Sequence, residues 1–136
     1  MHAYQYVVLR CVPRTDREEF VNVGIALYCP EEEFLGAAWR LDEERLTAFA
    51  PDLDLRGVRS ALEAVDLLCA GQPRDGAGVG VRATAYGVRA LSDDQSSRFG
   101  LIKAPKSTVL QPGPVHGGMT SDARHELEAL LERLVP

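Results

Sequence analysis

The segment 103–118 contains the side chains best suited to binding an anion. Lys103 and Lys106 are the only lysines in the chain, and the second is followed directly by Ser107 and Thr108. Ammonium groups, hydroxyls and the backbone amides of a nearby glycine pair could together hold a phosphate. A phosphate loop, however, has a Gly-Lys-Ser/Thr sequence after a strand, whereas here a proline precedes the second lysine. The simpler interpretation is a solvated cationic loop.

His116 lies in the same segment, where two prolines and two glycines restrict its backbone to an extended turn. Its imidazole is the one candidate for acid–base catalysis in the chain, because histidine changes charge near neutral pH. No serine or cysteine nucleophile in a recognisable signature accompanies it, and no further ligands lie at metal-binding spacing. We therefore predict no metal and no cofactor, and the simpler interpretation of His116 is a hydrogen-bonded structural residue.

Three other candidate binding residues, Tyr6, Arg10 and Asn22, lie on predicted strands. Because side chains alternate along a strand, Arg10 shares a face with Tyr6, and Asn22 shares a face of the next strand with Tyr28. Arginine and aromatic residues are enriched at protein interfaces, so this face is a candidate recognition patch. The simpler interpretation is structural: Arg10 bonds a carboxylate such as Glu19, and Asn22 satisfies backbone groups.

Three strands that must position this face are predicted at 4–12, 20–29 and 34–41, where β-branched and aromatic residues are bounded by Pro13 and Pro30. The polar connection between the first two is too short for a crossover helix, so the strands form an antiparallel meander. The core face of the second strand is predicted to consist of Val21, Val23, Ile25, Leu27 and Cys29.

Helices are predicted from Asp42 to Pro51, at 55–70 and at 121–135. The first should point Leu46 and Phe49 at the sheet. The second has a single apolar stripe and should end at Gly71; the stripe is Val58, Leu62, Val65 and Cys69. The third should be capped by Ser121 and dock on the core.

The rest of the chain is less regular. The glycine-rich segment 71–80 is predicted to be a flexible insertion, and 81–91 is compatible with a strand. A helical turn is predicted at 92–99, followed by an ordered but irregular segment over 99–110. Together the elements predict a single α+β domain over residues 1–136, in which an N-terminal antiparallel meander packs against two to three helices in two layers.

Composition narrows the classes of function. A net charge of −5 argues against a nucleic-acid or anionic-membrane surface. We expect no signal peptide, and no apolar run is long enough to predict a membrane-spanning segment. Its three cysteines share no C-x-x-C spacing and lie in apolar stretches, so we expect buried, reduced thiols. These features predict a cytoplasmic protein.

Three motifs resemble a small bacterial family catalogued as domain of unknown function 3037. They are Tyr4-x-Tyr6-Val7-Val8-x-Arg10-x-Val12-Pro13, Glu19-Phe20-Val21-Asn22-Val23-Gly24-Ile25, and Ser107-Thr108-Val109-Leu110-Gln111-Pro112-Gly113-Pro114-Val115-His116. The resemblance covers nearly the whole chain and implies no particular activity. It also implies a protein partner of a toxin–antitoxin or regulatory kind, because genes for HipA-like kinase-fold proteins are associated with such proteins as neighbours.

Two hypotheses for function follow. The first is a small non-enzymatic accessory or protein-interaction module, which uses the face with Arg10, Asn22 and Tyr6. The alternative is an enzyme or ligand-binding domain for a phosphorylated small molecule, which uses His116 and the segment 103–118. The first predicts a stable protein complex, whereas the second predicts stabilisation by a ligand.

Overall fold

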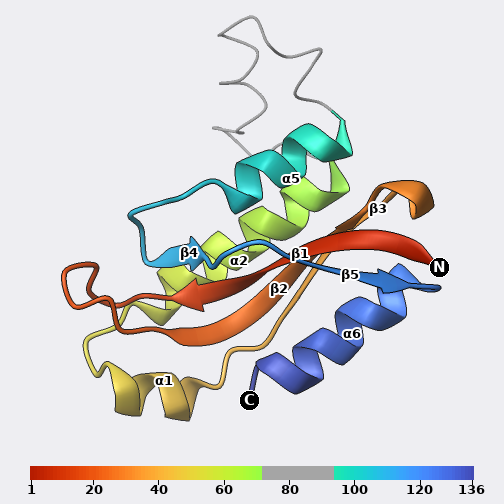
Figure 1. The fold of residues 1–136 in the computed structure, drawn as a ribbon. Coiled ribbons are helices and arrows are strands. Elements are labelled where there is room, and N and C mark those ends of the chain that lie inside the picture. The colour runs from red at the N-terminus through yellow and green to blue at the C-terminus, as the bar shows by residue number, and fades with distance from the viewer. Residues whose placement is uncertain (72–93) are drawn as a thin grey trace, which may run out of the picture.

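The computed structural model describes residues 1–71 and 94–136 (Figure 1). Its elements, in chain order, are β1 (His2–Cys11), β2 (Val21–Cys29), η1 (Pro30–Glu32), β3 (Phe34–Trp39), α1 (Glu43–Phe49), α2 (Leu55–Ala70), α5 (Gln95–Lys103), β4 (Leu110–Pro112), β5 (His116–Thr120) and α6 (Ala123–Leu134). The glycine-rich insertion after Gly71 and the strand predicted at 81–91 lie outside the described residues. None of the described helices is long and apolar enough to cross a membrane.

The sheet has five antiparallel strands within the described residues, in the order β3-β2-β1-β4, with β5 also paired to β1. The predicted β1–β2–β3 meander is confirmed. On the other side of β1, β4 pairs with its C-terminal part and β5 with its N-terminal part. Two short strands that the sequence did not predict therefore complete the sheet beside β1.

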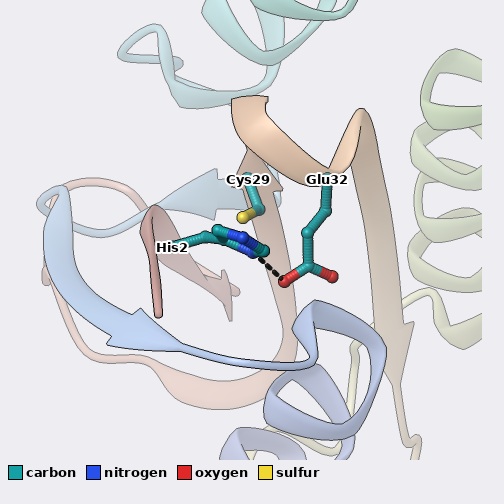
Figure 2. A group of neighbouring side chains, drawn as sticks. All are labelled: His2, Cys29 and Glu32. Carbon is teal, nitrogen blue, oxygen red and sulfur yellow. Dashed lines mark hydrogen bonds and ion pairs between the residues drawn. The ribbon is translucent and has the colours of Figure 1, made fainter.

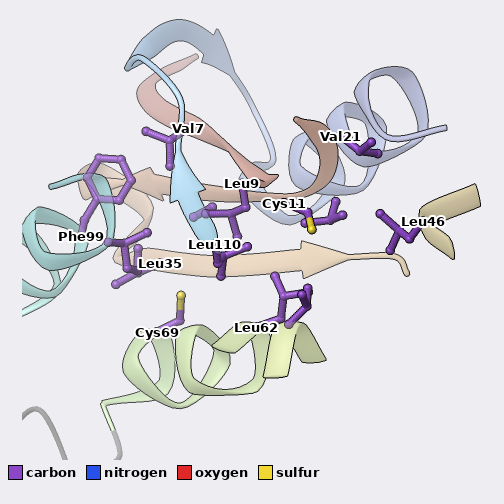
Figure 3. Close-up of a cluster of buried hydrophobic side chains, with 14 residues drawn as sticks. Val7, Leu9, Cys11, Val21, Leu35, Leu46, Leu62, Cys69, Phe99 and Leu110 are labelled. Atoms are coloured by element: carbon purple, nitrogen blue, oxygen red, sulfur yellow. The ribbon is translucent and has the colours of Figure 1, made fainter. Parts of the chain in front are cut away.

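Helices cover both faces of the sheet, and each face has its own core. The α2-side core joins the sheet to α1, α2 and α5 (Figure 3); its buried members are Val7, Leu9, Cys11, Val21, Val23, Ala26, Leu35, Leu46, Val58, Leu62, Cys69, Phe99, Ile102 and Leu110. The α6-side core consists of Tyr4, Ile25, Leu27, Cys29, Ala123, Leu127, Leu130 and Val135. The α+β class, with an N-terminal antiparallel sheet packed against helices, is confirmed.

A β-bulge in β2 overturns one part of the predicted pattern. The register of β1 and β2 shifts between Leu9 and Arg10, so Val23 has no partner on β1. An extra residue reverses the alternation of side chains beyond it. The five residues predicted to share one face are therefore divided: Val21 and Val23 belong to the α2-side core, and Ile25, Leu27 and Cys29 to the α6-side core.

Gly24 allows β3 to pack closely against this bulge. A Cβ at position 24 would lie 2.8 Å from the Cβ of Trp39 and 2.9 Å from the carbonyl oxygen of Ala38. One of these atoms belongs to the backbone of the neighbouring strand, so a side chain here would have to displace the strand itself.

The helix ends follow local rules. Each of the four described α-helices begins after an aspartate that accepts a hydrogen bond from the backbone N–H three residues later; these are Asp42, Asp54, Asp94 and Asp122. The prediction of Ser121 as a cap was wrong by one residue. The predicted end of α2 is confirmed, since Gly71 adopts a left-handed conformation with φ of 77°.

Two helices differ from expectation. Only Leu46 of α1 is buried, and Phe49 is 39% exposed instead of pointing at the sheet. The helix predicted to end near Phe99 continues to Lys103, because Phe99 and Ile102 both pack into the α2-side core.

Side chains from outside the helix hold α6 at both ends. The backbone N–H of its first residue, Ala123, donates to Glu32 Oε1 at 3.0 Å. In its last turn, Asn22 Nδ2 donates to the carbonyl of Leu134 at 3.1 Å, and Arg40 Nη1 donates to the following carbonyl at 3.1 Å. A carboxylate at the N-terminus and donors at the C-terminus complement the helix dipole. These contacts position α6 across β2 and β3.

Candidate functional site

Arg10 has an unusual environment at the end of β1. Its guanidinium lies over the ring of Phe20, with Cζ 4.0 Å from the ring centroid, and packs so closely on Gly113 that an added Cβ there would be 3.0 Å from Cζ. Its Nε is buried and has no hydrogen-bond partner among the described residues. The carboxylate expected beside it, Glu19, pairs instead with Arg17 at 2.8 Å. The structure therefore holds a cation on an aromatic ring without an acidic partner from the described chain.

Tyr6 lies on the same face of β1, four residues before Arg10, and pairs across the strands with His116 of β5. The two rings stack with centroids 5.2 Å apart and an interplanar angle of 30°. Within the part of the chain that the structure describes, the His116 imidazole makes this ring contact but no hydrogen bond or ion pair. Nothing there orients it for proton transfer. We call Tyr6, Arg10, Phe20 and His116 the aromatic–arginine strip.

The bulge removes one residue from the predicted patch. Tyr28 faces the α2-side core, where its ring contacts Phe99 with centroids 5.6 Å apart. Asn22 does share a face with Arg10, since the two are cross-strand partners. Its side chain, however, binds the C-terminal carbonyl of α6, which is a structural role.

Two of the predicted anion-binding groups of the segment 103–118, those of Lys106 and Thr108, bond to backbone carbonyls, and Lys103 Nζ lies 5.5 Å from the centroid of the Phe99 ring. Lys106 Nζ donates to the carbonyls of Leu101, Ile102 and Ala104 at 2.6, 3.2 and 3.0 Å, so it closes the C-terminal end of α5. Desolvation lowers the pKa of this lysine. The hydroxyl of Thr108 donates to a backbone carbonyl two residues later at 2.8 Å, and Ser107 is exposed.

A second group of polar side chains, which sequence reasoning missed, meets at the opposite end of β1 (Figure 2). His2 comes from the start of β1, Cys29 from the end of β2 and Glu32 from η1, and their potential ligand atoms all lie within 4.8 Å of one another. His2 Nδ1 and Glu32 Oε2 are 2.9 Å apart. We call this the His2 group. The only local sign of it in the sequence is the short spacing of the cysteine and the glutamate, because the histidine is remote in sequence.

The three cysteines are free and buried, as predicted. Burial raises the pKa of the Cys11 thiol to about 11 and that of Cys69 to about 12. Neither thiol is therefore poised to act as a thiolate nucleophile near neutral pH.

A cleft of about 300 Å³ lies between the β1–β2 connection and the α1–α2 connection. Arg14 and Arg17 line it, but they pair with Asp16 and Glu19 at 2.7 and 2.8 Å. None of the residues predicted to form a site lines this cleft. Its arginines thus offer less to a ligand than Arg10 does.

The family model described as protein of unknown function (DUF3037) matches residues 6–135. The chain belongs to this family. The DUF3037 match includes the whole aromatic–arginine strip and the segment 103–118, and it includes Cys29 and Glu32 but not His2. Neither a curated protein nor a solved structure matches the chain.

Proposed function

We propose that this chain is a non-enzymatic, cytoplasmic protein-interaction module and that the aromatic–arginine strip is its contact face. The observation that carries the proposal is Arg10, whose guanidinium is held on Phe20 and has no acidic partner among the described residues. Arginine and aromatic anchors dominate the energetics of protein interfaces. A partner that presents a carboxylate or a carbonyl oxygen to this guanidinium would form a charge-assisted hydrogen bond.

The environment of Arg10 favours recognition over a purely structural role. Buried polar atoms are almost always hydrogen-bonded, and an unsatisfied donor costs about 1–3 kcal/mol. A residue that served only the fold would be expected to have an internal acceptor, as Asn22 and Arg40 do at the end of α6. Arg10 Nε has no such acceptor in the described chain, and this unsatisfied donor supports a role in binding a partner.

The first partner to test is a HipA-like kinase-fold protein, because the family resemblance implies this class. An acidic or carbonyl-rich surface on that protein would complement Arg10, while Phe20, which is 42% exposed, would supply an apolar contact.

The decisive experiment compares the wild-type chain with Arg10→Met in direct binding to the purified kinase-fold protein by calorimetry. Methionine keeps an unbranched apolar stem but removes the charge. Arg56→Met is the matched control, because Arg56 is exposed on α2, which covers the other face of the sheet, and its loss changes the net charge equally. Asn22 is left unchanged, since its loss would release the end of α6.

We expect Arg10→Met to weaken binding at least about tenfold, with the folded state changed by less than about 1 kcal/mol. Loss of the cation–π contact costs about 0.5–1 kcal/mol, which removal of an unsatisfied buried donor offsets. Equal binding by wild type and Arg10→Met would refute the strip as the contact face. No binding by the wild-type chain at micromolar concentration would refute this partner.

The alternative, a binding site for a phosphorylated small molecule, would require Lys106 to leave the three carbonyls that it now caps. A thermal-shift screen with nucleotides and sugar phosphates separates the two hypotheses. A ligand at a hundred times its dissociation constant should add about 2.7 kcal/mol to the free energy of unfolding. Such a shift, lost in Lys106→Met, would favour the alternative.

A further inference from the structure

From the geometry of the His2 group we infer a divalent metal site, with Zn²⁺ as the ion that its ligands fit best. This inference is independent of the proposed contact face, whose central residue, Arg10, lies at the other end of β1. An imidazole nitrogen, a thiolate sulfur and a carboxylate oxygen are the three ligand types that proteins use for zinc. All three converge here from separate elements of the fold (Figure 2).

The distances suit an ion of this size. Ligand atoms around a tetrahedral zinc lie roughly 2.0–2.3 Å from the metal, and hence about 3.5 Å from each other. The three potential ligand atoms here lie within 4.8 Å of one another. Small rotations of two side chains would close the difference, since the His2 side chain is 37% and that of Glu32 22% exposed. Cys29 itself is fully buried, so an ion would have to reach its thiol past these two side chains.

A hydrogen bond from outside the group orients the carboxylate. Glu32 Oε1 accepts from the backbone N–H of Ala123 at 3.0 Å, which leaves Oε2 directed at His2 Nδ1. Metal-ligating carboxylates typically have such an outer partner, which holds one oxygen while the other binds the ion. The first residue of α6 therefore already supplies part of the support that a metal site needs.

The contact between His2 and Glu32 shows what the ion would replace. A ring nitrogen and a carboxylate oxygen 2.9 Å apart are both electron-pair donors, so a proton must lie between them. A divalent cation bound by both atoms would displace that proton to His2 Nε2 or to water, and Cys29 would release its thiol proton to water to become the third ligand. Three protein ligands leave a fourth tetrahedral position for water or another small ligand.

Titration of the untagged, chelator-treated chain with Co²⁺ tests this site, because cobalt reports its ligands in its absorption spectrum. We expect one Co²⁺ per chain, a thiolate-to-cobalt charge-transfer band, the visible bands of tetrahedral cobalt, and loss of both when Zn²⁺ is added. His2→Ala and Glu32→Gln should weaken binding about tenfold or more. Both replace partly exposed side chains, and circular dichroism of the metal-free variants verifies that they fold.

Two controls separate this site from adventitious binding. His125→Ala removes an exposed histidine on α6, and Cys69→Ala removes a buried cysteine of the α2-side core; both should retain the bands. Absence of the charge-transfer band in the wild-type chain would overturn the inference. So would cobalt binding that His2→Ala leaves unchanged, or that His125→Ala removes.

Discussion

Polar side chains at the two ends of β1 have different environments. At the His2 end, His2, Glu32 and Tyr4 all bond to groups of the same chain, and two of these bonds reach α6. At the other end, Asn22 also bonds to α6, but Arg10 stacks on Phe20 and its Nε has no partner in the described chain. Pairing with α6 thus distinguishes residues that hold the fold from Arg10, for which we propose a role in recognition.

The same comparison separates the two proposals. The His2 group could bind an ion because its members already converge on one point. The side chains of the aromatic–arginine strip do not converge on one point. The groups that it offers to a partner are the Arg10 guanidinium and the neighbouring aromatic rings. Three substitutions, one near Arg10 and two near His2, test how much the contacts at each end of β1 contribute to the free energy of unfolding.

The largest effect is expected from Gly24→Ala, at the bulge that places Asn22 opposite Arg10. The new Cβ would be 2.8 Å from the Trp39 Cβ and 2.9 Å from a backbone oxygen, so we expect a loss of at least about 2 kcal/mol in urea denaturation. Gly100→Ala is the control, because a Cβ there meets nothing within 4 Å and alanine favours the helix by up to about 1 kcal/mol. Equal stability of both variants would show that the bulge does not require glycine.

An intermediate effect is expected from Tyr4→Phe at the His2 end. Burial, followed by the hydrogen bond to Glu126, raises the pKa of Tyr4 from 10.0 to about 12. Because the pKa of Tyr4 is higher in the folded than in the unfolded state, the protonated phenol stabilises the folded state. This contribution is complete below pH 10 and is lost as the pH rises towards 12.

Tyr4→Phe should therefore lower the free energy of unfolding by about 1 kcal/mol at neutral pH. At alkaline pH, ionisation of Tyr4 should lower the free energy of unfolding of the wild-type chain by about 2–3 kcal/mol, and Tyr4→Phe should not show this decrease. Urea midpoints from neutral to alkaline pH measure both effects. Tyr6→Phe is the control, since its hydroxyl makes no hydrogen bond among the described residues. Identical alkaline curves for wild type and Tyr4→Phe would contradict the role of this hydroxyl.

The smallest effect is expected from Glu32→Gln. The hydrogen bond with His2, and then that from the Ala123 amide, hold the pKa of Glu32 below its usual value of 4.5. A lowered folded pKa contributes stability above pH 4.5 that disappears as the pH falls through the folded value. Wild type should lose stability more steeply in acid than Glu32→Gln does. Glu31→Gln, at an exposed neighbouring position, should follow the wild-type curve, and parallel curves for all three would refute the assignment.

Much of the fold could be predicted from local chemistry. The three N-terminal strands, the apolar stripe of α2 with its glycine stop, and the aspartate cap of α1 all follow from residue type and spacing. β4 and β5 could not be predicted in this way. They are short and rich in proline and glycine, and they are strands only because β1 offers them an unpaired edge.

The candidate sites were harder to predict. The sequence singled out Arg10 and placed it correctly with Tyr6, since β1 alternates without interruption. It misplaced Tyr28, because one extra residue in β2 reverses the alternation beyond the bulge. It offered Lys106, Ser107 and Thr108 as a candidate anion site beside the simpler interpretation of a solvated loop, and could not indicate that Lys106 Nζ donates to carbonyls at the end of α5.

The α+β class, the order of the main elements and the DUF3037 membership could be predicted from the sequence, because these depend on periodicity, turn residues and motifs that are local in the chain. Long-range packing sets which helix covers which face, leaves Arg10 without an acidic partner among the described residues, and brings His2 to Cys29 and Glu32. These outcomes depend on pairing between residues far apart in sequence. A single inserted residue in a strand is enough to change them, because strand register sets the face of every side chain beyond it.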